Sequence, residues 1–105
     1  MTLDELFNFL LNHLRVGQRE AVAAVEAAAK MIAFKYEAEL YKVFTKEDIK
    51  KANELSEKES QTYLHKRYEE IVGEKSDVLL NKIIDEVVSD IIKQPRDFFH
   101  FSEPA

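Results

Sequence analysis

The most constraining feature of the sequence is an unbroken helical segment at residues 18–44. It contains no glycine or proline, and its apolar residues recur at steps of three and four, the spacing of one helix face. These apolar residues are Val22, Val25, Ala29, Ile32, Tyr36, Leu40 and Val43. Such a helix is about 40 Å long, whereas a compact chain of 105 residues has a radius of gyration of about 13 Å. The sequence therefore predicts an elongated protein, or one that completes its core with another chain.

The scarcity of turn residues predicts that the rest of the chain is helical too. Two glycines and two prolines in 105 residues leave few tight turns, which a fold of several short strands would need. We expect four main helices, near residues 2–16, 18–44, 46–72 and 76–94. The predicted fold class is all-α, an elongated four-helix bundle or long helical hairpin. Residues 1–95 form a single domain in this prediction.

Local signals set the expected helix ends. Thr45 stands three residues before Asp48, which is the spacing of a capping box, and Ser76 is expected to cap the last helix. Helix C-termini are expected at Gly17, Gly73 and Pro95, with a left-handed cap at Gly17. The stretch 56–61 holds no apolar residue but also no breaker, so we expect the third helix to continue through it.

Charge and composition exclude several classes of function. The formal charge is −5, which disfavours nucleic-acid binding because that needs a basic face. The apolar runs are too short for a membrane span or a secretory signal peptide. The absence of cysteine excludes a disulfide framework and a thiolate zinc site, and it fits a reducing compartment. We therefore expect a cytoplasmic protein with no nucleic-acid or membrane partner.

Two acidic pairs, Glu54-x-x-Glu57 and Glu74-x-x-Asp77, resemble the paired acids that MazG-type nucleotide pyrophosphatases carry on two helices. In that family the carboxylates hold magnesium against the phosphates of a nucleotide, which is chemistry suited to a hard cation. The resemblance implies a magnesium-dependent nucleotide pyrophosphatase. The alternative, which we favour, is a solvated charged face, because 20 acids among 105 residues produce such spacings by chance.

No other pattern predicts a catalytic or metal centre. His65 and Glu69 lie one helical turn apart, but Lys66 and Arg67 stand between them and repel a cation. The two isolated glycines form no phosphate-binding loop. Nothing resembles a nucleophile elbow. We therefore expect no enzymatic activity, no cofactor and no bound metal.

The more informative residues are the aromatic ones and the apolar ones that recur along residues 18–44, which we call the seam of the second helix. The tyrosines of the two middle helices line the rim of the core or meet a partner surface, where tyrosine is enriched. Residues 96–105 hold three phenylalanines and are expected to form an extended tail, either a strap over the bundle or an anchor for a partner. The predicted partner-binding residues are Val25, Ile32, Tyr36, Tyr63, Tyr68, Phe98, Phe99 and Phe101.

The function that these features favour is a small non-catalytic interaction protein of inhibitor, immunity or adaptor type, regulatory and encoded by a phage or bacterium. We expect a protein partner, a homodimer formed through the seam of the second helix, or both. The opening Thr2-Leu3-Asp4-Glu5-Leu6, followed by Leu14-Arg15-Val16 and an alanine-rich helix, is similar to phage head–tail connector subunits. That resemblance implies a structural phage subunit as a further alternative.

Overall fold

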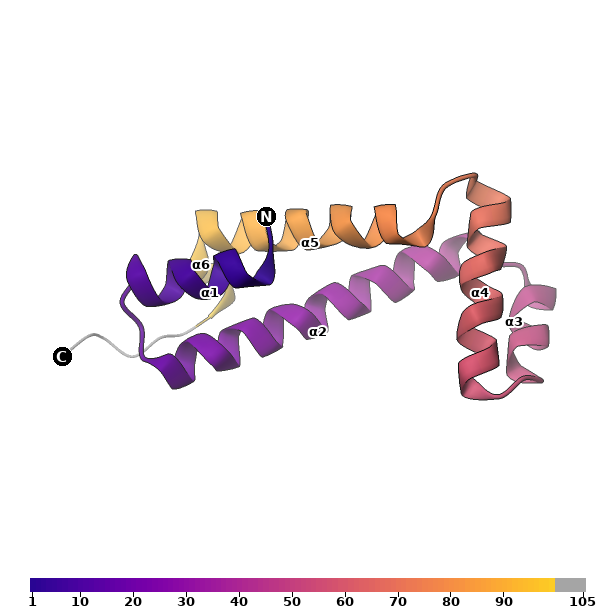
Figure 1. The fold of residues 1–105 in the computed structure, drawn as a ribbon, viewed down its shortest axis with the longest axis horizontal. Coiled ribbons are helices and arrows are strands. Elements are labelled where there is room, and N and C mark those ends of the chain that lie inside the picture. The colour runs from indigo at the N-terminus through magenta and orange to yellow at the C-terminus, as the bar shows by residue number, and fades with distance from the viewer. Residues whose placement is uncertain (100–105) are drawn as a thin grey trace.

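The computed structural model describes residues 1–99, and this part of the chain is all-α (Figure 1). The helices are α1 Leu3–Asn12, α2 Gln18–Val43, α3 Lys46–Asn53, α4 Glu57–Val72, α5 Ser76–Lys93 and α6 Pro95–Phe98. The molecule measures 55 × 25 × 19 Å and has a radius of gyration of 17.1 Å. A compact chain of this length would have about 13 Å. The predicted elongation is therefore confirmed.

The larger core lies where α1, the first part of α2 and α5 pack together. Ala21, Ala24 and Ala28 of α2 are buried there, and these small side chains let the neighbouring helices approach closely. The remaining buried residues of this core are Leu6, Leu10, Ile32, Ile83, Val87, Val88 and Ile91. Helix α5 contacts both α1 and α2.

The smaller core lies at the other end of α2, where α3 and α4 stand across it (Figure 1). Leu40, Phe44 and Tyr68 are buried there. Tyr36 and Leu79 pack against both cores and connect them. The arrangement of the described residues is a three-helix group joined by α2 to a helical hairpin. The all-α class is confirmed, whereas the elongated four-helix bundle or long helical hairpin that the sequence predicts is not.

The predicted continuity of a third helix through residues 56–61 is wrong. Helix α3 ends at Asn53, and α4 begins at Glu57. Ser56 caps the new helix, because its Oγ accepts a hydrogen bond from the backbone N–H of Glu59 at 3.3 Å. Acids in the first turn of α4 favour this start through the helix dipole. The break lets α3 and α4 fold back on each other.

Several predicted helix ends are correct and others are displaced. Thr45 and Asp48 form the complete capping box, and Gly73 ends α4 with a φ of 82°. Gly17 does not provide a left-handed cap: its φ is −63° and it precedes α2. The left-handed residue after α1 is Arg15, with a φ of 55°. The displaced ends are α1, which stops at Asn12, and α5, which is capped at Lys75 with Ser76 as its first helical residue.

The C-terminal segment also differs from its prediction. Pro95 ends α5 as expected, but it also starts α6, so residues 95–98 are helical and not extended. Proline suits the first position of a helix because its missing N–H would have no partner there. None of the helices described for residues 1–99 combines the length and the apolar character that a membrane span requires.

Replacing Gly73 by alanine should lower the free energy of unfolding by about 1 kcal/mol, because a Cβ is strained in the left-handed region. Open space surrounds the glycine, so the loss comes from the backbone alone. Gly17→Ala is the matched control: its surroundings are equally open and its φ is negative, so it adds no backbone strain, and the loss from replacing this N-cap glycine should be smaller than that at Gly73. Urea denaturation of both variants checks this, and an equal loss at the two glycines would contradict it.

Candidate interaction surface

The seam predicted on α2 is divided between the protein's own cores and its surface. Ile32 is only 5% exposed and belongs to the larger core. Val25 and Tyr36 are half-buried against the same core. Val22 and Ala29 are exposed. The part of the seam that includes Ile32 therefore serves the fold of a single chain.

The two other predicted tyrosines serve the packing of α4. Tyr68 is buried in the smaller core, and burial raises the pKa of its hydroxyl, with a further contribution from Glu74. Tyr63 is half-buried, and its hydroxyl donates to Oδ1 of Asp48 at 3.5 Å. Both side chains are largely enclosed by their own chain.

The tail phenylalanines lie in different environments. Phe99 packs against the larger core, whereas Phe98 is 40% exposed. Their ring centroids are 6.5 Å apart. The predicted contact residue Phe101 lies outside the described residues. Phe99 behaves as a strap on the core, and Phe98 presents part of its ring to solvent.

The four acids that resemble a pyrophosphatase site do not converge. Glu54 and Glu57 lie at the junction of α3 and α4, and Glu74 and Asp77 lie at the junction of α4 and α5. The sixteen residues of α4 separate the two pairs by about 24 Å. All four acids are exposed. Within residues 1–99, no group of three or more His, Cys, Asp or Glu side chains is placed to hold a metal ion.

A serine–histidine contact occurs where α2, α4 and α5 meet. Nδ1 of His65 lies 2.7 Å from Oγ of Ser76 and 3.3 Å from the hydroxyl of Tyr36. An unprotonated Nδ1 accepts hydrogen bonds from both hydroxyls. Ser76 is only 4% exposed, so a substrate cannot reach its oxygen as it would reach that of a catalytic serine. The contact joins three helices.

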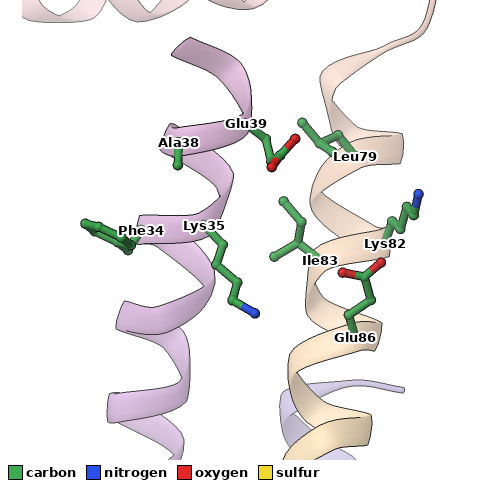
Figure 2. A pocket seen from close by; sticks show the side chains of 8 residues that line it. All are labelled: Phe34, Lys35, Ala38, Glu39, Leu79, Lys82, Ile83 and Glu86. Atoms are coloured by element: carbon green, nitrogen blue, oxygen red, sulfur yellow. The ribbon is translucent and has the colours of Figure 1, made fainter. Parts of the chain in front are cut away.

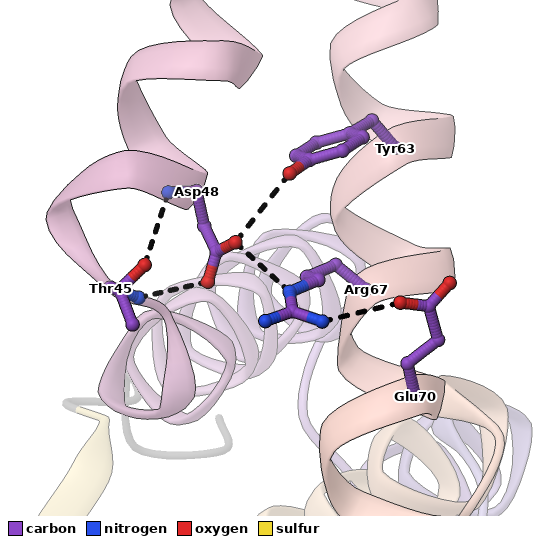
Figure 3. A network of polar contacts seen from close by, with 5 residues as sticks. All are labelled: Thr45, Asp48, Tyr63, Arg67 and Glu70. Carbon is purple, nitrogen blue, oxygen red and sulfur yellow. Dashed lines mark hydrogen bonds and ion pairs between the residues drawn. The ribbon is translucent and has the colours of Figure 1, made fainter.

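A second polar network fixes α3 to α4 (Figure 3). Oδ2 of Asp48 accepts the backbone N–H of Thr45 at 3.0 Å, and Oδ1 accepts Nε of Arg67 at 2.9 Å. Arg67 also pairs with Glu70 at 3.2 Å. These hydrogen bonds, first that of the Thr45 backbone and then that of Arg67, hold the pKa of Asp48 below its usual value, although burial opposes them.

The outward face of α2, which we define by the exposed residues from Arg19 to Tyr41, carries the most exposed large apolar side chain. Phe34 is 74% exposed, and Tyr41 and Val22 are 47% and 41% exposed. Figure 2 shows the Phe34 ring pointing away from α5. Exposed alanines lie between these residues, at positions 23, 29, 33 and 38. Sequence reasoning missed Phe34 because it lies off the predicted seam; its apolar bulk at an off-seam position was the available signal.

Two grooves border this face. One, of about 420 Å³, lies between α2 and α5 and mixes charges of both signs, including Lys35, Glu39 and Glu86 (Figure 2). The other, which we call the corner groove, has about 240 Å³ and lies between α2 and α4. It is lined by Ala33, Tyr36, Glu37, Leu40, Tyr41, Phe44, Gln61, Leu64 and His65. Three of its nine lining residues, Tyr36, Tyr41 and Phe44, carry aromatic rings of the kind that is enriched where protein surfaces meet.

Comparison with known proteins finds no match: no protein-family model, no curated protein and no solved structure is similar to the chain.

Replacing Asp48 by asparagine should lower stability at neutral pH, because the charged carboxylate makes the bonds to Thr45 and Arg67. The folded pKa lies below the usual 3.8, so this stabilisation is present above pH 3.8 and is lost as the pH falls through the lower folded value. The stability difference between wild type and variant should therefore shrink below about pH 4. Denaturation at several pH values measures it. Glu47→Gln, at an exposed acid of the same turn, is the control; a difference unchanged by pH would contradict the assignment.

Truncation of two neighbouring residues of α2 should change stability by very different amounts. Ile32→Ala should cost about 2–4 kcal/mol because it leaves a cavity in the larger core. Phe34→Ala should change the stability of the monomer by less than about 0.5 kcal/mol, because the ring is solvated. Chemical denaturation at low protein concentration measures both values. A large loss for Phe34→Ala would show that its ring is part of the monomer fold.

Proposed function

We propose that the protein is a non-catalytic helical interaction protein that binds another polypeptide through the outward face of α2. The observation that carries the proposal is Phe34, which is 74% exposed in the middle of a 26-residue helix. Burying a phenylalanine ring in a complex is worth about 1.5–3 kcal/mol. Clustered exposed apolar residues on a soluble surface are typical of interaction sites.

The rigidity of the face supports the same function. Helix α2 is packed against the larger core along its first part and against the smaller core at its end. The backbone that carries the outward side chains is therefore held in place before a partner arrives. Such preorganisation reduces the entropy lost on binding. The corner groove extends the surface beyond Tyr41 with further aromatic rings.

The proposal includes a regulatory role in the cytoplasm, of inhibitor, immunity or adaptor type. The absence of cysteine supports a reducing compartment. The separation of the four acids along α4 is the reason that we do not favour the pyrophosphatase alternative. Magnesium-dependent hydrolysis of nucleoside triphosphates that disappears in Glu54→Gln would overturn the non-catalytic part of the proposal.

Photo-crosslinking from position 34 tests the binding surface. Phe34 is replaced by the photoreactive analogue p-benzoylphenylalanine in cells that naturally make the protein. The expected result is a crosslinked species heavier than the 12.2 kDa chain. The same analogue at Lys51, an exposed residue of α3, should give no such species. No product from position 34, or equal products from both positions, would contradict the proposal.

A further inference from the structure

The charges along the outward face of α2 form a pattern that complements itself. Lys35 and Glu39 line the groove beside α5. The other exposed charges of the face, Arg19, Glu26, Lys30 and Glu37, read positive, negative, positive, negative along the helix. All four side chains are exposed. Among residues 1–99, none of these four charges takes part in an ion pair within the chain.

The pattern matches an antiparallel copy and not a parallel one. Positions 19 and 37 lie nine residues on either side of position 28, and positions 26 and 30 lie two residues on either side. Reversing the helix about position 28 therefore sets Arg19 against Glu37 and Glu26 against Lys30. A parallel copy in register would set each charge against itself, which is unfavourable.

The apolar residues of the face follow the same two-fold arrangement. Val22 and Phe34 lie six residues on either side of position 28, and Ala23 and Ala33 lie five residues on either side. At 3.6 residues per turn, Val22 and Ala33 share one edge of the face, whereas Ala23 and Phe34 share the other. In an antiparallel pair each large side chain therefore meets a small one: Phe34 meets the partner's Ala23, and Val22 meets the partner's Ala33. Alternation of large and small side chains is what close packing of two helices needs.

From this geometry we infer that a second copy of the chain binds the outward face of α2 and forms a homodimer with antiparallel α2 helices and a two-fold axis at the level of Ala28. The inference rests on the proposed function and names its partner. The contact from Arg19 to Glu37 spans about 27 Å, roughly half the 55 Å length of the molecule.

The corner groove lies within reach of the same partner. Its α2 lining runs from Ala33 to Tyr41. Reversal about position 28 brings residues 18–23 of the second copy's α2, Arg19 among them, to the level of residues 33–38. Glu37, which lines the groove, is the residue that faces this arginine. A contact of this size belongs to the small, reversible class of interfaces, below about 1,200 Å².

Mass measurement by light scattering at low ionic strength, where exposed charges are least screened, tests the inference. The wild-type mass should rise with concentration from 12.2 kDa toward twice that value. Glu26→Lys and Lys30→Glu should each weaken dimerisation about tenfold, because each changes two symmetric attractive pairs into repulsive ones.

Mixing the two variants should restore dimerisation to about the wild-type level, because every close pair is then of opposite sign. The matched controls are Glu69→Lys and Lys66→Glu on the exposed side of α4, which should each dimerise like the wild type. Phe34→Ser is a second, uncharged variant that should lose dimerisation and keep the wild-type melting temperature of the monomer.

A wild-type chain that stays monomeric at all concentrations overturns the inference. So does a mixture of the two variants that associates no better than either alone. Dimerisation of Glu26→Lys and of Lys30→Glu alone at the wild-type level indicates parallel helices and also overturns it, because residues 26 and 30 then each face their own copies and either substitution leaves like charges opposed. If the chain is monomeric while Phe34 still crosslinks to a different protein, the proposed function stands and only the inference falls. If Phe34 crosslinks to nothing, both fall.

Discussion

The structure depends on the length of α2. The first part of this 26-residue helix packs with α1 and α5, and its C-terminal end reaches the α3–α4 hairpin. The two cores are separate, and α2 is the longest element that contributes to both. A chain of 105 residues cannot surround a helix of this length. One side of α2 is therefore left to solvent, and the exposed phenylalanine follows from the same constraint.

Polar contacts orient the helices where the apolar packing is thin. Tyr36, His65 and Ser76 join α2, α4 and α5 between the two cores. Asp48 and Arg67 fix α3 on α4 beside the smaller core. Among the described side chains, no buried nitrogen or oxygen lacks a hydrogen-bond partner. The hydroxyls of Tyr36 and Ser76, the imidazole of His65 and the carboxylate of Asp48 are engaged in holding the helices together.

The outward face of α2 shows why an interaction surface is hard to read from an alanine-rich helix. Apolar residues occur on two adjacent stripes of α2, one through Ala21, Ala24 and Ala28 and one through Val22 and Ala29. The predicted seam follows the second stripe and continues through Ile32 and Leu40, because these residues recur at steps of three and four. In the structure the alanine stripe is buried, because alanines allow α1 and α5 to come close to the α2 backbone. Ile32 and Leu40 of the predicted seam are buried as well, whereas Val22 and Ala29 are left exposed.

The sequence by itself determined the all-α class, the extent of α2, the capping box at Thr45 and the end of α4 at Gly73. These features depend on local backbone conformation and on side chains within one helical turn, so they can be read along the chain. Only the tertiary structure decided which stripe of α2 is buried, where the third helix breaks and how α4 stands across α2. Those choices depend on how closely particular side chains from distant segments fit together. The exposure of Phe34 is a result of that fit, and periodicity along the chain marks the residue only as lying off the predicted seam.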